Sequence, residues 1–364
     1  MSKKGTLGFL TYDWSFGTKP LQPNGCAWYR CFLPMKELSK LDWETGMGIP
    51  GYNQEHGFGI LIPDEKAIHG WDIVVLKLIM LNRVVDQVTE ARKKGQKIVV
   101  DIDDHMEALE PTNMAFKTTS PDANPNNNRD HYNKIIDQAD ALIMSTPFLK
   151  EYYQKKYPDK PIFVVRNSID IDRWHMRKDK SGHFPTVGWV GATPWRSGDL
   201  ETLNPFFGEY LSKNNLRFHH SGSIINAPSV LQQIGIEEKS YTSEPMKPIM
   251  KYPELFRKMD IGIVPLRDVE FNHAKSYLKG LENAAAGVPF IASGGLPEYQ
   301  LLADAGVGRI ANTPDEWIGH MTDLLNPKTR LKERMESHKI VSEEFSMKQR
   351  GYEWDEVFRT ILAL

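Results

Sequence analysis

The sequence of 364 residues is poor in cysteine, with only Cys26 and Cys31. Because both lie on one short segment, they cannot form a framework of disulfide bonds, and buried thiols in a reducing compartment are the simplest interpretation. The sequence also lacks any apolar run close to the roughly 20 residues that cross a bilayer, so we expect no membrane span. The first residues, MSKKGTLGFLTYDW, turn polar too soon for a signal peptide. These absences predict a cytoplasmic protein.

The sequence also lacks an excess of charge of either sign. The 45 Lys and Arg residues face 47 Asp and Glu residues, which gives a formal net charge of −2. No basic block stands out, so nothing in the overall charge indicates a protein that wraps nucleic acid, although a local basic groove stays open. The hydrophobic content of 40% and the charged content of 25% are those of an ordinary globular protein, and the length favours two domains.

Apolar strand-like runs alternate with helical patterns along most of the chain. This alternation is typical of parallel sheets with helices on both faces. A polar stretch at 168–185 divides the alternation into two series, so we expect an α/β fold of two Rossmann-like, doubly wound domains with a ligand cleft between them. The runs expected to be strands are 6–12, 71–78, 97–104, 141–145 and 162–165 in the first series, and 186–192, 217–222, 260–266 and 289–293 in the second. The helices expected between and after them include 27–41, which Pro34 must kink or restart, 84–95, 131–140, 148–157, 205–211 and a largely helical C-terminus.

The segment FNHAKSYLKGLENAAAGVPFIAS (271–293) predicts a regular helix that leads into a buried strand. Its apolar stripe is formed by Leu278, Leu281 and Ala285, and its expected ends are the N-cap Asn272 and the stop residue Gly287.

On this helix, Lys275 would fall in the first turn, where the helix dipole disfavours a cation. An anionic ligand at that end would explain it. Lys275 and Glu282 are seven residues apart, so they would share a face roughly 10 Å apart along the axis, about the span from a phosphate to a ribose in a nucleoside diphosphate. A carboxylate accepts from both ribose hydroxyls, and a lysine neutralises phosphate. A solvated amphipathic face is the alternative.

A second polar segment follows the first strand of the second series, in GWVGATPWRSGDL. Gly191 would let the backbone approach a ligand, and the start of the next helix would offer N–H groups to a phosphate. Glycine after a strand is common, and this spacing matches no fixed phosphate-binding motif. Together with the preceding helix, however, it predicts that Arg196 and Lys275 meet at one diphosphate.

These segments resemble the retaining GT-B glycosyltransferases, the group 1 or family 4-like enzymes of bacterial or phage type. The resemblance covers nearly the whole chain and is most specific at MDIGIVPLRDVEFNHAKSYLKGLENAAAGVPFIAS. It also includes NGCAWYRCFLPMKEL, QADALIMSTPFLKEYYQKKY, VGWVGATPWRSGDL and the junction VVRNSIDIDRW, where Ser168 replaces the usual glycine. It implies an N-terminal acceptor-side domain at 1–167, a nucleotide-sugar domain at 168–345, and a C-terminal helix at 346–364 that returns to the first domain. It also implies the cytoplasm of a bacterium or of a phage-infected cell.

The resemblance assigns roles to individual residues. It implies a donor site at Gly25, Gly191, Arg196, Asn272, Lys275, Ser276 and Glu282, with Arg196, Lys275, His105 and Asp104 closest to the reacting bond. Asp103, Asp104 and His105 would lie on the lip of the cleft, and a solvated loop is the other interpretation of His105. One position departs from the family pattern. Many relatives have a sugar-contacting glutamate eight residues before the ribose glutamate, and here Ala274 stands there, so the donor sugar is not implied.

The run DIDD, at Asp101–Asp104, offers a rival hypothesis for the first half. An Asp-x-Asp after a strand is able to hold Mg²⁺ or Mn²⁺ against a diphosphate, as in GT-A glycosyltransferases. Because cationic side chains are already available for the phosphates, we expect no metal and no cofactor besides the donor. Nearby, Trp28 is expected to pack in a helix, whereas Arg30 is less readily explained by packing alone.

The expected activity is transfer of a sugar from a nucleotide-diphosphate donor to an acceptor hydroxyl, with retention of anomeric configuration. A nucleotide-sugar epimerase on the same fold and a non-catalytic nucleotide-sugar-binding protein are the alternatives. The acceptor stays open among protein, glycan, small molecule and modified nucleic-acid base.

Overall fold

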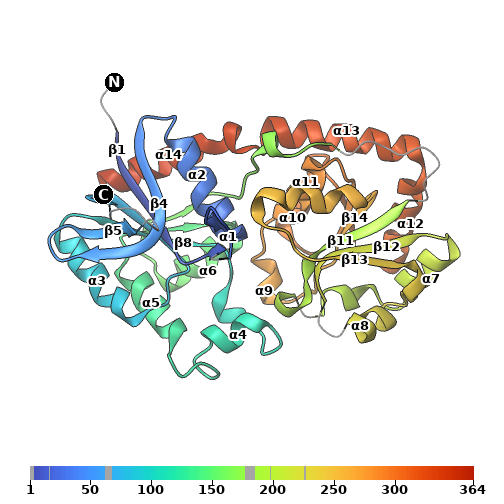
Figure 1. Cartoon of the computed structure of the whole chain (residues 1–364), viewed down its shortest axis with the longest axis horizontal. Helices are drawn as coiled ribbons and strands as arrows, with labels where there is room; N and C mark the ends of the chain where they lie inside the picture. Colours follow the sequence, from blue (N-terminus) through green and yellow to red (C-terminus); the bar gives the residue numbers. More distant parts are fainter. Residues whose placement is uncertain (1–3, 16, 62–67, 177–184, 197, 225–226) are drawn as a thin grey trace. The chain divides into compact units, whose positions relative to one another are not determined.

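The computed structural model describes residues 4–15, 17–61, 68–176, 185–196, 198–224 and 227–364. The chain forms two compact units, each with its own sheet, which are described separately below (Figure 1). Unit 1 comprises Met1–Leu109, Ala115–Ser168 and Met347–Leu364, and unit 2 comprises Glu110–Met114 and Ile169–Ser346. The expected class, α/β with two Rossmann-like domains, is confirmed.

The units change one residue later than the expected domain bounds, after Ser168 and after Ser346. The short segment Glu110–Met114 belongs to unit 2, which the sequence did not indicate. Within the polar stretch expected at the junction, residues 177–184 lie outside the described residues.

Unit 1 is built on a sheet in the order β10-β9-β8-β7-β1-β4-β5-β6. Neighbouring strands are parallel except for the pairs β4–β5 and β5–β6. Strand β1 lies where the order reverses, so the carboxyl ends of β1, β7 and β8 meet at one edge. The strands are β1 (Gly5–Thr11), β4 (Trp43–Asn53), β5 (Gly57–Leu61), β6 (Ile68–His69), β7 (Ile73–Lys77), β8 (Lys97–Ile102), β9 (Ala141–Met144) and β10 (Ile162–Val164), with a small hairpin of β2 (Trp14–Ser15) and β3 (Gln22–Pro23).

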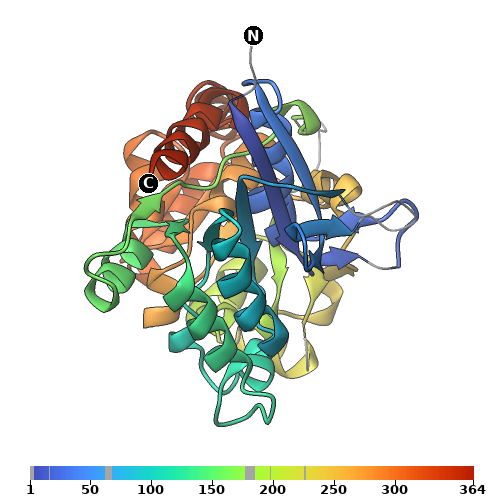
Figure 2. The same ribbon diagram turned by 90° about the vertical axis from the view of Figure 1, so that its left-hand side faces the viewer.

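Helices pack on both faces of this sheet. Their bounds are α1 (Gly25–Ala27), the π-helix η1 (Trp28–Phe32), α2 (Leu33–Leu38), α3 (Asn82–Lys93), η2 (Met106–Ala108), α4 (Met114–Thr119), α5 (Asn128–Gln138), α6 (Pro147–Lys156) and α14 (Met347–Ala363). The helix expected at 27–41 restarts at Pro34, which occupies the first turn of α2. Helix α14 lies beside β1, where Phe358 packs edge-on against Phe9 with ring centroids 5.9 Å apart (Figure 2).

Unit 2 contains a fully parallel sheet in the order β13-β12-β11-β14-β15-β16. When the strands of unit 2 are numbered from one to six along the chain, this order is 3-2-1-4-5-6, and its direction reverses between β11 and β14. The strands are β11 (Thr186–Ala192), β12 (Arg217–Ser223), β13 (Tyr241–Glu244), β14 (Ile261–Val264), β15 (Phe290–Ser293) and β16 (Arg309–Ala311). A single hydrophobic cluster that includes Val187, Phe218 and Ile263 packs these strands against helices such as α7 (Phe206–Lys213) and α12 (Pro314–Leu325).

The other elements of unit 2 are mostly short. They are η3 (Ile171–Arg173), η4 (Thr193–Trp195), η5 (Leu200–Leu203), α8 (Ala227–Gln233), η6 (Glu238–Ser240), the 3-10 helix η7 (Ile249–Lys258), α9 (Glu270–His273), α10 (Leu278–Ala285), α11 (Pro297–Asp304) and α13 (Pro327–Glu344).

The single helix expected from Asn272 to Gly287 is wrong, because the chain forms two helices there. Helix α9 ends at His273, and α10 begins only after Tyr277. The intervening Tyr277 is fully buried and packs edge-on against Phe345, with ring centroids 5.6 Å apart. Tertiary packing of this segment overrides a local pattern that would suit one continuous helix.

Candidate functional site

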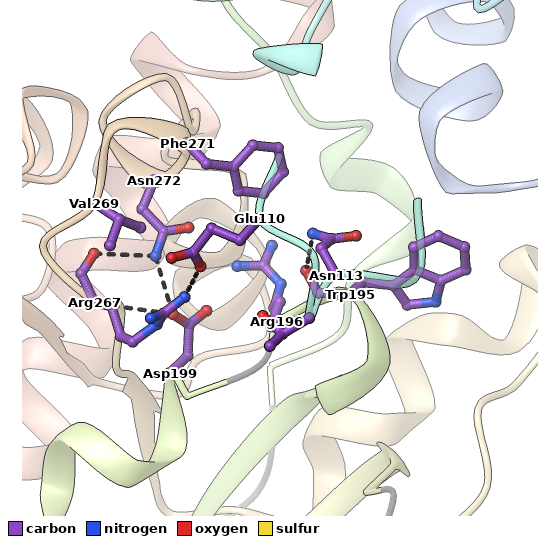
Figure 3. Close-up of a pocket in the computed structure, with 10 residues that line it drawn as sticks. Glu110, Asn113, Trp195, Arg196, Asp199, Arg267, Val269, Phe271 and Asn272 are labelled. Atoms are coloured by element: carbon purple, nitrogen blue, oxygen red, sulfur yellow. Dashed lines mark hydrogen bonds and ion pairs between the residues drawn. The ribbon is translucent and has the colours of Figure 1, made fainter. Parts of the chain in front are cut away.

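A pocket in unit 2 opens between the loops that follow β11 and β14, the two strands at which the strand order reverses. Open parallel sheets bind their ligands at this place. All its lining residues belong to unit 2: Glu110, Thr112, Asn113, Trp195, Arg196, Asp199, Arg267, Val269, Phe271 and Asn272 (Figure 3).

The loop after β11 is shaped by a short 3-10 turn and a glycine. Pro194 lies in the first turn of η4, which begins at Thr193, and Arg196 and Gly198 follow. Gly198 has φ +83°, and a Cβ there would lie 2.8 Å from Nε of Arg267. Only glycine meets both conditions without strain. The close packing brings the loop after β11 against the Arg267 side chain from the loop after β14.

The side chain of Asp199 connects the loop after β11 to the loop after β14. Its side chain is 1% exposed, and its Oδ1 accepts from the backbone N–H of Arg267 (3.0 Å) and from Nδ2 of Asn272 (2.9 Å). Burial raises the pKa of Asp199, and the positive charges of Arg196 and Lys275 act in the opposite direction. Among the described residues, the other oxygen, Oδ2, is buried without a hydrogen-bond partner.

Asn272 has a different role from the one expected. It lies inside α9, whose N-cap is Val269, so the predicted N-cap at Asn272 is wrong. Its Nδ2 donates to Asp199 and to the carbonyl of Arg267 (3.0 Å). With 4% of its surface exposed, Asn272 is a brace between the two loops.

Segment Glu110–Met114 contributes two contacts to the pocket. Glu110 forms an ion pair with Arg267, and Nδ2 of Asn113 donates to the carbonyl of Trp195 at 3.0 Å (Figure 3). The first contact fixes the loop after β14 and the second fixes the loop after β11.

Of the two cations expected at the diphosphate, Arg196 lines the pocket and Lys275 contacts one of its lining residues. None of the residues drawn in Figure 3 accepts a hydrogen bond from Arg196. The ammonium of Lys275 lies over the ring of Phe271, 4.1 Å from its centroid, and Phe271 itself lines the pocket. Both cations act on the pKa of Asp199, so they share one neighbourhood.

Lys275 and Ser276, however, lie between α9 and α10 rather than on a helix. The expectation that Lys275 and Glu282 share a helical face is therefore wrong.

Glu282 is on α10, but it is buried and only 2% exposed. Its Oε2 accepts from the hydroxyl of Tyr252 (3.0 Å) and from Nζ of Lys279 (2.8 Å). The alternative of a solvated face is therefore wrong for Glu282. Burial raises the pKa of the Tyr299 hydroxyl, and the charge of Arg196 opposes this shift while that of Glu282 adds to it.

Two further positions are explained by packing. A Cβ on Gly191 would lie 2.4 Å from the ring of Trp189, so the glycine makes room for that side chain. Its carbonyl accepts from Nε2 of His220 at 3.1 Å. Ala274 is fully buried and brings no polar group to a ligand.

The remaining expected residues belong to unit 1. Gly25 begins α1 and is exposed, with open space where a Cβ would point. Asp104 is half-buried after β8. His105 is 1% exposed, and its ring packs 4.2 Å from that of Tyr152, so the interpretation as a solvated loop residue is wrong.

The DIDD run carries a buried charge network. Asp101 is fully buried and pairs with Arg30 (2.6 Å) and Lys77 (3.2 Å), and Lys77 also pairs with Asp103. Burial alone would lower the pKa of Lys77, but Asp103 and Asp101 raise it overall. Both carboxylates of the Asp-x-Asp are thus already bound by cationic side chains.

Arg30 is a structural residue of unit 1. Besides Asp101, its guanidinium donates to the carbonyl of Val165 (2.6 Å) and lies 4.8 Å from the ring centroid of Trp354 on α14. With 1% of its surface exposed, it joins three separate segments of unit 1.

Of the ten residues that line the pocket, the sequence predicted only Arg196 and Asn272, and it missed three charged residues: Asp199, Arg267 and Glu110. Asp199 and Arg267 each follow a strand that flanks the reversal of strand order, and polar residues at such strand ends are a usable signal once the order is known. Glu110 had no comparable signal, because it comes from a segment that precedes the rest of unit 2 by more than fifty residues.

The two Rossmann-like units define the GT-B fold. Solved structures share it over the full chain: sucrose-phosphate synthase (tll1590) of Thermosynechococcus elongatus superposes with a TM-score of 0.67 at 12% identity, over 99% of this chain and 100% of that one. A glycosyltransferase of Rickettsia africae gives 0.65 at 12% identity, over 100% and 99%. Anabaena HepE, solved with UDP-glucose, gives 0.63 at 12% identity, over 98% and 100%.

Comparison of the sequence alone identifies no related family or protein. No family model matches the chain, and a search of curated proteins finds no relative. Across the described part of the chain, no helix has both the length and the apolar character needed to cross a membrane.

Proposed function

We propose that the protein is a retaining glycosyltransferase that transfers a sugar from a nucleotide-diphosphate sugar to an acceptor hydroxyl. The observation that carries this proposal is the pocket at the reversal of strand order in unit 2: Arg196 lines it, and the ammonium of Lys275 lies over the ring of Phe271, which also lines it. Outside that lining, the carboxylate of Glu282 is buried and held by Tyr252 and Lys279. Cations at this place suit a diphosphate, and a fixed carboxylate suits a pair of ribose hydroxyls.

The donor is held through three groups. Arg196 and Lys275 bind the diphosphate. Glu282 accepts from the ribose, and its orientation is set in advance by Tyr252 and Lys279. Preorganisation of this kind lowers the cost of binding.

The chemistry follows from the charge on the leaving group. The bond between the anomeric carbon and the diphosphate oxygen breaks, and the electron pair stays on the diphosphate, where Arg196 and Lys275 stabilise the growing charge. The acceptor oxygen forms its bond to the anomeric carbon from the same face, and its proton passes to the leaving phosphate. Retention follows, and no covalent protein nucleophile is needed.

Two of the similar structures support a nucleotide-sugar donor. Anabaena HepE was solved with UDP-glucose and also with UDP, and another neighbour is a sucrose-phosphate synthase. We carry over only the class of donor. The acceptor stays open among protein, glycan, small molecule and modified nucleic-acid base.

The proposal includes independence from metals and a cytoplasmic location. The metal hypothesis needs Asp101 and Asp103, and these carboxylates are bound by Arg30 and Lys77. Two cysteines without a disulfide, Cys26 and Cys31, suit a reducing compartment.

A donor screen tests the activity. Thermal shift with a panel of nucleotide sugars, UDP-glucose included, identifies the bound nucleotide, and mass spectrometry then follows hydrolysis and transfer. We expect one nucleotide class to raise the melting temperature and its sugar to be released or transferred. Donor consumption that yields an epimerised sugar without any acceptor would instead favour the epimerase, and binding without turnover would favour a binding protein.

Chelation tests metal independence. We expect turnover in excess EDTA to match turnover with added Mn²⁺, because cationic side chains take the place of a metal. Complete loss on chelation, restored by Mn²⁺ and abolished in Asp103→Asn, would support the Asp-x-Asp hypothesis instead.

A further inference from the structure

One oxygen in the pocket has no partner among the described residues. Asp199 lines the pocket, is 1% exposed, and uses only Oδ1 for its bonds to Arg267 and Asn272. Its Oδ2 is buried and accepts no hydrogen bond from any residue in the part of the chain that the structure describes. Buried polar atoms are rarely left in this condition, because removal from water without a new hydrogen bond is costly. A ligand that donates a hydrogen bond to Oδ2 would remove this cost.

The charge of Asp199 restricts what that ligand group can be. A diphosphate held by Arg196 and Lys275 carries only acceptor oxygens, and a carboxylate beside them would repel it. The group that faces Asp199 must therefore be a neutral donor attached next to the diphosphate. In a nucleotide sugar, two parts meet this description: the ribose, which the proposed function places at Glu282, and the transferred sugar.

We propose that Asp199 is a specificity-determining residue whose Oδ2 accepts a hydrogen bond from one hydroxyl of the transferred sugar. This inference rests on the proposed function and extends it to recognition of the sugar. The bonds of Oδ1 to both loops fix the carboxylate, so Oδ2 selects donors that bring a hydroxyl to one place.

The test pairs Asp199→Asn with donors that lack single hydroxyls. The substitution preserves the shape and the acceptor at Oδ1, which the N–H groups of Arg267 and Asn272 hold in place, and it changes the acceptor at Oδ2 into a donor. With the full donor, we expect kcat/KM to fall at least 10-fold, while the affinity for the nucleoside diphosphate stays within about 2-fold of the parent.

The deoxy donors identify the contact. The donor that lacks the recognised hydroxyl should lose at least 10-fold in kcat/KM with the parent but less than 2-fold with Asp199→Asn, because the hydrogen bond is already gone. Asp268→Asn is the matched control: this carboxylate lies in the loop after β14, is 87% exposed, and pairs with His273. It should follow the parent with every donor.

Several results would overturn the inference. Equal losses with all donors, or a parallel loss of nucleoside diphosphate affinity, would assign Asp199 a structural role, and a melting curve of each variant separates that case from unfolding. Unchanged kcat/KM in Asp199→Asn would mean that a protonated Asp199 donates to the diphosphate instead. If the parent turns over normally, these outcomes contradict this inference alone. A parent that binds no nucleotide sugar contradicts the proposed function, and this inference with it.

Discussion

Both units carry charged residues near the carboxyl ends of their parallel strands, but the two groups of residues differ in their hydrogen-bond and ion-pair partners. In unit 1, Lys77, Asp101 and Asp103 lie at or just after the ends of β7 and β8, and they form ion pairs with one another and with Arg30 of η1. In unit 2, no residue drawn in Figure 3 accepts a hydrogen bond from Arg196, and Oδ2 of Asp199 has no partner among the described residues. The charges of unit 1 are therefore paired with one another, whereas the pocket of unit 2 contains both the Glu110–Arg267 ion pair and, in Oδ2 of Asp199, an oxygen without a partner among the described residues.

The difference teaches how to separate structural from functional charges in such a fold. Strand ends attract polar residues in both units, so position alone does not distinguish them. A buried charged side chain whose polar atoms all have partners indicates a structural role, since removal of one partner leaves an uncompensated buried charge. A buried charged side chain with one polar atom left without a hydrogen-bond partner indicates a site where a ligand supplies that partner.

The largest effect should come from Arg30→Ala. It removes the partner of Asp101, the donor to Val165 and the contact with Trp354, so we expect the free energy of unfolding to fall by about 3–5 kcal/mol. Denaturant unfolding measures the loss. Arg196→Ala is the matched arginine variant in unit 2, and it should stay within about 0.5 kcal/mol of the parent. Equal losses for both would remove the contrast between the units.

The next largest effect concerns catalysis and the charge of Lys275. Lys275→Ala should lower both kcat and kcat/KM about 100-fold, because charge on the leaving phosphate grows in the transition state. Its melting temperature should match the parent, since the side chain is only half-buried. Steady-state kinetics beside a melting curve measure both. An active variant would mean that the ammonium of Lys275 contacts protein groups, such as the ring of Phe271, and does not bind the diphosphate.

A smaller effect is expected from Glu282→Gln. The weaker acceptor should reduce the affinity for nucleoside diphosphate by about 1–3 kcal/mol, shared by ground and transition states, so KM rises more than kcat falls. Titration calorimetry measures it. Because Glu282 is buried with Lys279 and Tyr252, the substitution should also lower the melting temperature. Tyr252→Phe serves as the control, since it removes one bond to Glu282 and keeps the carboxylate; unchanged affinity in Glu282→Gln would exclude Glu282 from the ribose site.

The smallest effect concerns pH and Asp199. The folded protein raises the pKa of this carboxyl, so the folded state holds its proton at pH values where the unfolded chain has lost it. That contribution to stability is present below the unfolded pKa of about 3.9 and is lost as pH rises through the folded value. Asp199→Asn lacks it. The stability of the variant relative to the parent should therefore increase from pH 4 upwards, by at most about 1.4 kcal/mol per pH unit. Melting curves at several pH values measure the difference, and a constant difference would contradict the raised pKa.

Much of the fold was predictable because buried strands leave a strong signal. Apolar runs such as IVVLK in β7 and ALIM in β9 appear where expected. Strand β4 was missed, since WETGMGIPGYN carries three glycines and a proline and has no clear alternation. Strands β13 and β16 are short and lie at the sheet edges, where few apolar side chains are needed.

Of the predicted site residues, Arg196 and Asn272 line the pocket, whereas Gly25, Asp104 and His105 belong to unit 1. Arg196 and Lys275 lie near one pocket, but the reason is the packing of two loops and not the spacing on one helix. The break between α9 and α10 depends on the burial of Tyr277 against Phe345, a contact between residues far apart in sequence. The pairing of Arg30 with Asp101 likewise joins distant segments, and no local pattern reveals it.

One feature at the ends of unit 2 affects how the chain can be cut and rejoined. Ile169, where the long segment of unit 2 begins, forms a β-bridge with Ser346, where it ends, and its N–H donates to the carbonyl of Phe345 at 3.1 Å. The long segment thus enters and leaves unit 2 through adjacent points, as in a domain inserted into a loop of another. Its ends are close enough for a short linker to close the segment into a ring or to move its termini elsewhere on its surface. A gene for unit 1 with the same short linker in place of the insertion would keep its three segments in their natural order.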